Sequence, residues 1–584
     1  MNALVILLIS IAFLVCGYLF YGKWLAKEWG VDPSRETPAH TLADGLDYCP
    51  AKAPVLLGHH FASIAGAGPI NGPIQAAVFG WVPVLLWVLL GGVFFGATHD
   101  FAALFSSIRH EGKSIGHVIE VNIGRKGKRL FLVFSYLTLL LVVAAFGSIV
   151  VGTFASSTDP TSAAYNVANG RTAMISILFI LLAILFGFFV YRRNAPLGVS
   201  TVIGVAALVL CIVIGYNFPV HASATFWSFF VLAYILIASI TPVWILLQPR
   251  DYLNSFLLYG MIILAIVGIL AAHPTVALPA FTGFRGIAGN SYLFPVLFIT
   301  VACGAISGFH SLVGSGTTAK QLDNEKDAMA IGYGGMLIEC ALAVISLLCI
   351  GVLFNNSEAL SAVGSKLTLA GSGMLMTADG SAAASPTAVF ATGIAYMLTK
   401  IGLPYNVMYS ILILSVSAFC LTSLDTATRL ARYMLQEFFV DEGEDAKNLT
   451  GFKKFIANPF VSTLITVILG GLLMTGGYTK IWPLFGAANQ LLAALALLAS
   501  AAWLGNIGRN NKMFIFPMIF MLAATLTSLL ITFVTKCQSL AGGSATVAAD
   551  ALQVFFSAVL FILAIVLVVE GVRTLTTKKP AEKR

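Results

Sequence analysis

The sequence predicts an all-α polytopic membrane protein with about fifteen transmembrane helices. Of its 584 residues, 58% are hydrophobic and only 10% are charged, whereas a soluble globular chain has about 45–50% apolar and about 25% charged residues. Apolar runs of roughly 20 residues, long enough to cross a bilayer as a helix, recur from end to end. Because lipid offers no hydrogen bonds to the main chain, such runs must be helical, and the short alternating segments of a membrane β-barrel are not seen.

The distribution of basic residues predicts the topology. The first apolar run is followed by Lys23 and Lys27 and has no basic residue before it, so we expect the N-terminus outside and the next loop inside. If the chain then crosses the membrane at each expected span, all but six of the 33 Lys and Arg residues lie inside. The C-terminus also lies inside. The six outside are Arg171, Arg285, Lys366, Lys400, Lys480 and Lys536. The expected spans are 2–22, 54–80, 81–107, 129–156, 172–190, 197–217, 224–247, 252–272, 294–318, 328–353, 404–427, 458–476, 481–505, 513–535 and 551–572.

The most informative local feature is segment 58–73, inside the second span. It reads Gly58-His59-His60-Phe61-Ala62-Ser63-Ile64-Ala65-Gly66-Ala67-Gly68-Pro69-Ile70-Asn71-Gly72-Pro73. Pro removes a donor and Gly costs about 1 kcal/mol against Ala, so we expect 66–73 to be unwound. Broken helices build substrate sites in secondary transporters, and the N–H groups opening a half-helix favour a carboxylate. The expected substrate contacts are Ser63, Gly66, Ala67, Gly68 and Asn71. A kinked packing helix is the alternative.

A second disrupted segment, 303–318, contains four glycines, one histidine and several hydroxyls. We expect Ser311 to contact substrate. If the coupling ion were sodium, its ligands would be Ala65, Ser315, Thr317 and Thr318. A helix interface of small residues is the alternative interpretation.

A third segment, 238–252, is interrupted by Pro242, and Thr241 and Trp244 are further candidates for substrate contact. Counted from span 54–80, span 224–247 is the sixth and runs in the opposite direction. Two opposed broken helices, five spans apart, are what an inverted repeat of five plus five helices requires. We therefore expect a LeuT-like core with broken helices.

The expected domains follow from this core. They are an extra N-terminal helix with a cytoplasmic loop (1–53), a ten-helix transporter core (54–427), a cytoplasmic loop (428–457) and a C-terminal region of four membrane helices (458–584). Counting 386–403 as a span would move the basic loop 428–457 outside, so we expect an outer or re-entrant helix there. The preceding segment 354–385, rich in Gly, Ser and Ala, is typical of a gate or lid.

Ionisable residues inside membrane spans usually mark pathways or proton relays. We assign proton coupling to His59, His60, His310, Asp100, Glu339 and Asp425, because histidine changes charge near physiological pH. Glu339 lies far from the ends of its span and must be neutral or paired. For Asp100 and Asp425, a structural salt bridge with Arg109 or Arg429 is an equal alternative. A zinc site formed by His59, His60, His99 and Asp100 has no spacing signature, so we expect neither a metal nor a cofactor.

Other patterns exclude other classes of protein. There is no HExxH or Walker motif, so the sequence predicts neither a zinc protease nor an ATP-driven pump, and we do not expect an enzyme. The net charge of +8 belongs to the cytoplasmic loops and does not indicate nucleic acid. Cysteines within apolar runs are interpreted as small buried hydrophobes. Asn489 and Gln490 are expected to form hydrogen bonds between helices.

Taken together, five motifs resemble those of the carbon starvation protein (CstA) family. They are Asp47-Tyr48 with Pro50, Gly58-His59-His60-Phe61 through Gly68-Pro69, Gly314-Ser315-Gly316-Thr317-Thr318-Ala319-Lys320-Gln321, Thr422-Ser423-Leu424-Asp425-Thr426-Ala427-Thr428-Arg429, and Trp482-Pro483-Leu484-Phe485-Gly486 with Ala488-Asn489-Gln490. The resemblance implies a bacterial or archaeal inner-membrane carrier related to the amino acid–polyamine–organocation group. It also implies uptake of peptides or of pyruvate, the latter by proton symport, often when nutrients are scarce.

The sequence thus favours a secondary transporter that imports a small carboxylate-bearing solute, such as pyruvate, amino acids or short peptides, by proton symport. Its expected partners are this solute, a coupling proton or sodium ion, and the lipid bilayer. The alternatives are a sodium-coupled carrier of the same solutes and a membrane sensor that binds solute without moving it.

Overall fold

The computed structural model describes residues 1–44, 48–162, 164–193, 195–242, 245–286, 291–354, 367–369, 375–377, 385–439, 449–543 and 547–576. Apart from a short antiparallel hairpin of β1 (Leu367–Leu369) and β2 (Leu375–Thr377), its regular elements are helices. This confirms the all-α class. Parts of the motif at 47–50, of the expected lid at 354–385 and of the loop at 428–457 lie outside the described residues.

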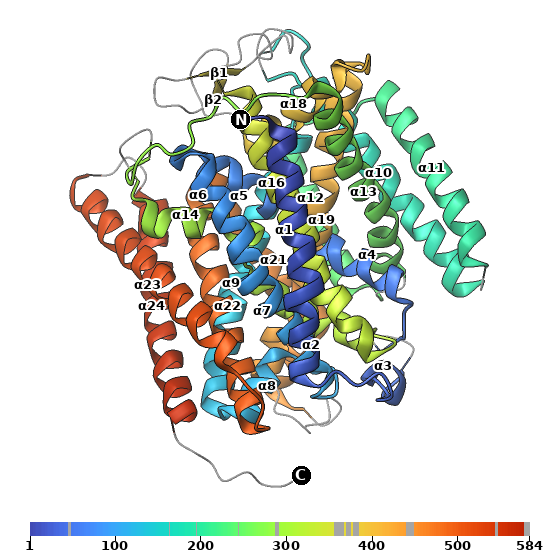
Figure 1. Ribbon diagram of the computed structural model, residues 1–584. Coiled ribbons are helices and arrows are strands. Elements are labelled where there is room, and N and C mark those ends of the chain that lie inside the picture. The colour runs from blue at the N-terminus through green and yellow to red at the C-terminus, as the bar shows by residue number, and fades with distance from the viewer. Residues whose placement is uncertain are drawn as a thin grey trace.

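Most helices run between the two ends of the bundle shown in Figure 1. In chain order, the α-helices are α1 (Ala3–Cys16), α2 (Lys23–Trp29), α3 (Pro38–Thr41), α4 (Ala53–Ile64), α5 (Gly68–Ala76), α6 (Trp81–Leu86), α7 (Ala97–Ile108), α8 (Ile115–Asn122), α9 (Arg125–Phe154), α10 (Val167–Gly187), α11 (Leu197–Asn217), α12 (Ala224–Ile240), α13 (Leu247–Ala272), α14 (Leu293–Val301), α15 (Gly308–Gly316), α16 (Gly334–Leu353), α18 (Pro386–Thr399), α19 (Tyr405–Phe439), α20 (Gly451–Ala457), α21 (Pro459–Met474), α22 (Tyr478–Asn506), α23 (Lys512–Ala541) and α24 (Val547–Thr576).

Among the described residues, twelve helical spans are long and apolar enough to cross a membrane, so this is a multi-pass membrane protein. Several of these spans include a 3₁₀-helical or π-helical stretch, such as the π-helical η3 (Trp87–Gly96), which joins α6 to α7. The other three expected spans are the interrupted pair α4–α5, the 17-residue α12, and α21, which forms a pair bent by 74° with α20. The count of fifteen therefore stays a prediction.

Two long helices form the centre of the bundle. α9 has 30 residues and α19 has 35, and they pack extensively against each other. α19 continues to Phe439, beyond the boundary expected at 427, so part of the segment expected as a cytoplasmic loop is helical. On the flanks of Figure 1, α23 and α24 lie on one side and α11 lies on the other.

The chain repeats one order of elements on either side of α10–α13. An interrupted helix is followed by a span and then by a long central helix: α4–α5, α6–α7 and α9 in the first half, and α14–α15, α16 and α19 in the second. α18 precedes α19, as α8 precedes α9, and α18 packs against α5, α13 and α16. This order brings the two interrupted helices together.

Candidate functional site

The first interruption separates α4 from α5 at residues 65–67. Ala65 leaves the helical region with ψ of 47°, and α5 begins at Gly68. The unwound part is therefore shorter than the stretch 66–73 expected from the sequence. Pro69 lies in the first turn of α5, where a missing N–H costs no hydrogen bond, and this position allows the helix to start there.

Close approach explains a glycine at position 66. A Cβ on this residue would lie 2.7 Å from the Phe146 ring of α9 and 2.9 Å from the Ser423 hydroxyl of α19. That hydroxyl donates to the Ser63 carbonyl at 3.1 Å, while the Ser63 hydroxyl is buried without a hydrogen-bond partner among the described residues. The break therefore lies against both central helices.

The second interruption, between α14 and α15, lies directly against the first. A Cβ on Gly68 would overlap the Cys303 side chain, and one on Gly72 would lie 2.5 Å from the Val301 carbonyl oxygen. α15 begins at Gly308, and the Asn489 amide oxygen accepts from the Phe309 N–H at 2.8 Å. This contact confirms the expected hydrogen bonding of Asn489 between helices, and Gln490 likewise donates to the Phe298 carbonyl.

The sequence-based interpretation of Pro242 as the second break of the repeat is wrong. α12 ends at Ile240, Thr241 is extended, and a separate helix, α13, begins at Leu247. The Thr241 hydroxyl donates to Ile237 within α12, and its carbonyl accepts from Arg429. Pro242 thus terminates a helix, because a residue before proline avoids the helical conformation. Trp244 lies outside the described residues.

A cluster of buried carboxylates and histidines, formed by His99, Asp100, His310 and Glu339, joins α7, α15 and α16. One Asp100 oxygen lies 2.7 Å from His310 Nδ1 and the other lies 2.7 Å from His99 Nδ1. His310 Nε2 lies 3.3 Å from Glu339, so both nitrogens of one imidazole face carboxylates. Glu339 thus lies beside an imidazole, in agreement with the second of the two alternatives, neutral or paired, that its position in the span left open. We call this group the carboxylate–histidine cluster.

His60 connects the two interrupted helices beside this cluster. Its Nδ1 lies 2.8 Å from the Thr318 hydroxyl, which follows α15 in the 3₁₀ turn η6 (Thr318–Lys320). Its ring also packs against α16, since a Cβ on Gly335 would lie 3.2 Å from His60 Cδ2. His60 therefore links α4, η6 and α16.

His59 faces a second buried group on the other side of α4. Its Nδ1 lies 3.2 Å from Asp251, and Asp251 accepts from Arg250 at 2.9 Å. Arg250 also pairs with Asp425 of α19, which accepts from the Tyr234 hydroxyl at 2.7 Å. We call Arg250, Asp251, Asp425 and Tyr234 the arginine cluster.

The proposed salt bridges with Arg109 and Arg429 are both wrong. Arg109 pairs with Glu325, and Arg429 donates to the main-chain carbonyls of Ala238 and Thr241. Arg250 and Asp251, expected in a loop, are instead buried in the first turns of α13. Pro249 was the available signal, because proline is favoured in the first turn of a helix, whereas no pattern in the sequence singles out Tyr234.

The remaining candidates surround the interruptions with their hydroxyls engaged. Ser311 donates to the Gly308 carbonyl at 2.6 Å, and Ser315 donates to the Ser311 carbonyl at 2.6 Å while accepting from the Ile115 N–H. Thr387 of α18 donates to the Asn71 amide oxygen at 3.3 Å. Ala65 and Ala67 form the first break, and Thr317 caps α15. Within the described part of the chain, no three His, Cys, Asp or Glu residues are placed to hold a metal ion.

Comparisons with known proteins agree with this picture. The family model described as "Carbon starvation protein CstA" matches residues 2–528. The chain is 36% identical to the peptide transporter CstA of Escherichia coli over 90% of this chain and 80% of that protein. It is 34% identical to the peptide transporter CstA of Campylobacter jejuni (90% and 79% covered) and 33% identical to the pyruvate/proton symporter BtsT of Escherichia coli (90% and 81%).

A solved structure shows the same fold. The manganese transporter of Eremococcus coleocola aligns with a TM-score of 0.51 over 91% of this chain and 99% of that chain, at 11% identity. The likeness concerns the fold alone, and it agrees with the LeuT-like class expected from the sequence.

Proposed function

This chain belongs to the carbon starvation protein CstA family, and from that premise we propose that it imports a small carboxylate-bearing solute together with protons. The class of solute includes pyruvate and short peptides, which the names of its relatives contain. One observation carries the proposal: His310, in the second half of an interrupted helix, lies buried between Asp100 and Glu339.

The interrupted helices supply the site for the solute. The first turn of α5 begins at Gly68, and its N–H groups carry partial positive charge that favours a carboxylate. Ser63 lies in the last turn of α4, two residues before the break, and its buried hydroxyl has no hydrogen-bond partner among the described residues. Ser63, Gly66, Ala67, Gly68 and Asn71 remain our candidates for the solute site.

The carboxylate–histidine cluster supplies the site for the proton. His310 Nδ1 is hydrogen-bonded to Asp100, and its Nε2 lies 3.3 Å from Glu339, so the imidazole stands between two carboxylates to which it could pass a proton. Burying a neutral cluster costs less free energy than burying a charged one. Uptake of a proton by the cluster would therefore favour closure of the site around the cluster. The contact between His60 and Thr318 connects α4 to η6, so a movement of η6 would also move α4.

Sodium coupling receives less support. Of the hydroxyls that would ligate sodium, Ser315 is committed to hydrogen bonds with Ser311 and Ile115, and Thr318 to one with His60. A sodium site would need oxygens that are free to turn toward the ion. The alternative of a sensor that binds solute without moving it is tested by measuring uptake into liposomes.

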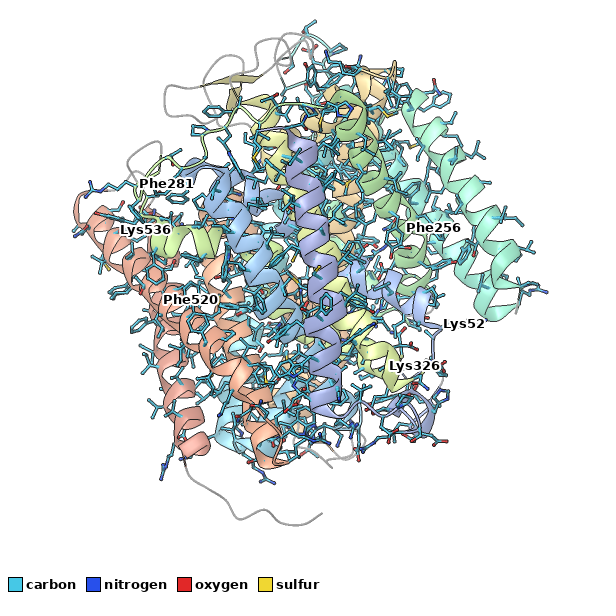
Figure 2. All side chains as sticks on the ribbon, viewed as in Figure 1. Lys52, Phe256, Phe281, Lys326, Phe520 and Lys536 are labelled. Carbon is cyan, nitrogen blue, oxygen red and sulfur yellow. The ribbon has the colours of Figure 1, made fainter. Side chains whose placement is uncertain are left out.

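We propose the cytoplasmic membrane of a bacterium or archaeon as the location, with the N-terminus outside and the C-terminus inside. In Figure 2, Lys52 and Lys326, which the threading places inside, lie in the lower half, and Lys536, placed outside, lies in the upper half. This separation supports the orientation expected from the basic residues.

The test is uptake by purified protein in liposomes. Labelled pyruvate, alanine and dialanine are offered under an inward proton gradient without sodium, and under a sodium gradient at equal pH. We expect accumulation of at least one solute with the proton gradient alone. Accumulation that requires sodium would reject proton coupling, and binding without accumulation would reject transport.

A further inference from the structure

An apolar groove of about 470 Å³ runs between α4, α16 and α1 with its π-helical continuation η1 (Gly17–Gly22). One wall also includes Ala330 of the π-helical η8 (Met329–Tyr333). Of the described residues that line the groove, none is charged, and Tyr18 alone has a polar side-chain atom. In Figure 1, α1 stands in front of α16, and α4 lies beside it. Such a lining favours a hydrocarbon chain over water.

The groove has the depth of one leaflet of a bilayer. Along α1 and η1, its lining extends from Ile11 to Leu19, which corresponds to about 12 Å at a rise of 1.5 Å per residue. Half of the hydrocarbon core of a bilayer is about 15 Å thick. This stretch belongs to the span Ala3–Trp29, which is long and apolar enough to cross a membrane. The molecules that reach the groove in the membrane are therefore lipids.

A lysine lies at the same end of each wall of the groove. Lys23 follows the lining residue Leu19 by four positions, and Lys326 precedes the lining residue Ala330 by four positions. Lys52 directly precedes α4. All three lysines are exposed. Figure 1 shows α2, which begins at Lys23, in the lower half of the molecule, and Figure 2 shows Lys52 and Lys326 there as well.

Acidic residues offset only part of this charge. Close to Lys326 in sequence, Asp323 and Glu325 contact basic residues of other segments. Asp327 is the neighbour of Lys326 and attracts it. Because Asp327 offsets one of the three lysines, the other two leave an excess of positive charge at this end of the groove, which favours an anion.

α16 separates the groove from the carboxylate–histidine cluster. Gly334 lines the groove, while a Cβ on its neighbour Gly335 would lie 3.2 Å from His60 Cδ2. One turn further along α16, Ile338 lines the groove, and its neighbour Glu339 belongs to the cluster. A chain in the groove therefore packs against the back of the helix that carries Glu339.

We propose that the groove binds one phospholipid with an anionic headgroup, from the leaflet that the proposed orientation places inside. An acyl chain fills the groove, and the headgroup lies beside Lys23, Lys52 and Lys326. The general excess of lysine at the cytoplasmic ends of spans does not require three of them to meet at one apolar groove. Each lysine near the membrane surface strengthens the binding of an anionic lipid about fivefold.

The test measures lipid binding to the purified full chain in detergent by native mass spectrometry. The probes are phosphatidylglycerol, which is anionic, and phosphatidylcholine, which is zwitterionic, with the same acyl chains. We expect the unchanged protein to bind one phosphatidylglycerol at least about fivefold more tightly than phosphatidylcholine. In the triple variant Lys23→Gln, Lys52→Gln, Lys326→Gln, this preference should fall below about twofold.

A second triple variant controls for the change in net charge. Lys126→Gln, Lys454→Gln and Lys512→Gln remove the same charge from exposed positions on α9, α20 and α23. The preference for phosphatidylglycerol should persist in this protein. Because all six lysines are exposed, both triple variants should melt at the same temperature as the unchanged protein when no lipid is added.

A further pair of variants tests the position of the acyl chain. Ala341 lines the groove, so the larger side chain of Ala341→Phe would occupy it. We expect this variant to bind both lipids about tenfold more weakly. Ala206→Phe, on the exposed face of α11, is the control and should bind both lipids normally.

Equal binding of the two lipids by the unchanged protein would overturn the proposal, and so would a preference that survives in the first triple variant. Loss of the preference in both triple variants would reject the site as well, because net charge would then select the lipid. If Ala341→Phe binds lipid as tightly as Ala206→Phe, the acyl chain does not lie in this groove.

Discussion

His310 Nδ1 lies 2.7 Å from an Asp100 carboxylate oxygen, although 210 residues of chain separate the two. Glu339 faces the other nitrogen of the same ring. The three side chains come from α15, α7 and α16, and all are buried. Any movement of α15 relative to the other two helices changes the surroundings of the imidazole, and we therefore propose that its protonation and the position of α15 depend on each other.

Replacing Glu339 by glutamine should uncouple transport from protons. Glutamine keeps the size of the side chain but cannot change charge, so the cluster loses a proton-binding group. We expect accumulation of solute under a proton gradient to fall at least about tenfold, while exchange of labelled for unlabelled solute at equal pH continues. Both rates are measured in liposomes, with the exposed residue change Glu36→Gln as control. Proton-driven accumulation at the normal rate in Glu339→Gln would remove this residue from the mechanism.

Replacing Gly68 by alanine should separate the two interrupted helices. The new methyl group would overlap the Cys303 side chain, and overpacking of this kind costs about 1–3 kcal/mol of unfolding free energy. We expect a lower melting temperature in detergent and little transport. Gly152→Ala is the control, because its methyl group would have no neighbour within 4 Å. Equal melting temperatures for the two variants would contradict the close contact between α5 and the second break.

Replacing Arg250 by methionine should destabilise the protein strongly. The change leaves Asp251 and Asp425 buried without their cation, and breaking a buried ion pair from one side costs about 3–5 kcal/mol. Adding Asp425→Leu removes one of the two stranded charges, so the double variant should be more stable than Arg250→Met alone. The free energy of unfolding is measured with denaturant in detergent for the unchanged protein, for Arg250→Met and for the double variant. A double variant less stable than the single one would show that Asp425 does not depend on Arg250.

His110 should make stability depend on pH. Burial lowers the pKa of His110 below its ordinary value of 6.5. Its Nδ1 donates to the Ser106 carbonyl at 2.7 Å, and its Nε2 accepts from the Asn122 amide at 3.4 Å, so the neutral ring satisfies both contacts. Below pH 6.5 the unfolded chain binds a proton that the folded protein resists, so stability falls as pH falls through this value toward the lowered pKa.

The measurement is the melting temperature in detergent at pH 7.5 and pH 5.5. The difference between the two pH values should be smaller in His110→Gln than in the unchanged protein, because glutamine can make both hydrogen bonds and does not titrate. An identical difference in both proteins would mean that His110 titrates normally.

Local composition was sufficient to locate both interruptions at the site. The glycines and prolines of 58–73 and the glycines of 303–318 predicted breaks, and the structure has breaks at 65–67 and at 302–307. The extent of the first break was overestimated, since Pro69 is tolerated in the first turn of α5 and Pro73 lies within that helix. Pairing the first break with Pro242 failed because a proline that ends a helix and one that interrupts it look alike in sequence.

The partners of the buried charged residues could not be predicted from the sequence. Arg109 and Arg429 lie close in sequence to Asp100 and Asp425, yet Asp100 pairs with His310, and Asp425 with Arg250, 175 residues away. A residue nine positions away lies on the opposite face of a helix, so Arg109 does not face the same way as Asp100. A residue four positions away shares the face, but for Asp425 and Arg429 the facing helices provide other partners, Arg250 and the carbonyls of Ala238 and Thr241.

The amino acids alone predict that this chain crosses a membrane, that helices break within 58–73 and 303–318, and that His60, His310 and Glu339 lie within spans. These features follow from the transfer of local segments out of water and from the geometry of Gly and Pro. The folded structure is needed to learn which charges meet, that Thr318 connects His60 to the second interrupted helix, and that Lys320 lines a cavity at the end of that helix. Those contacts join segments that are distant in the chain, and helix packing rather than local preference sets the distances between them.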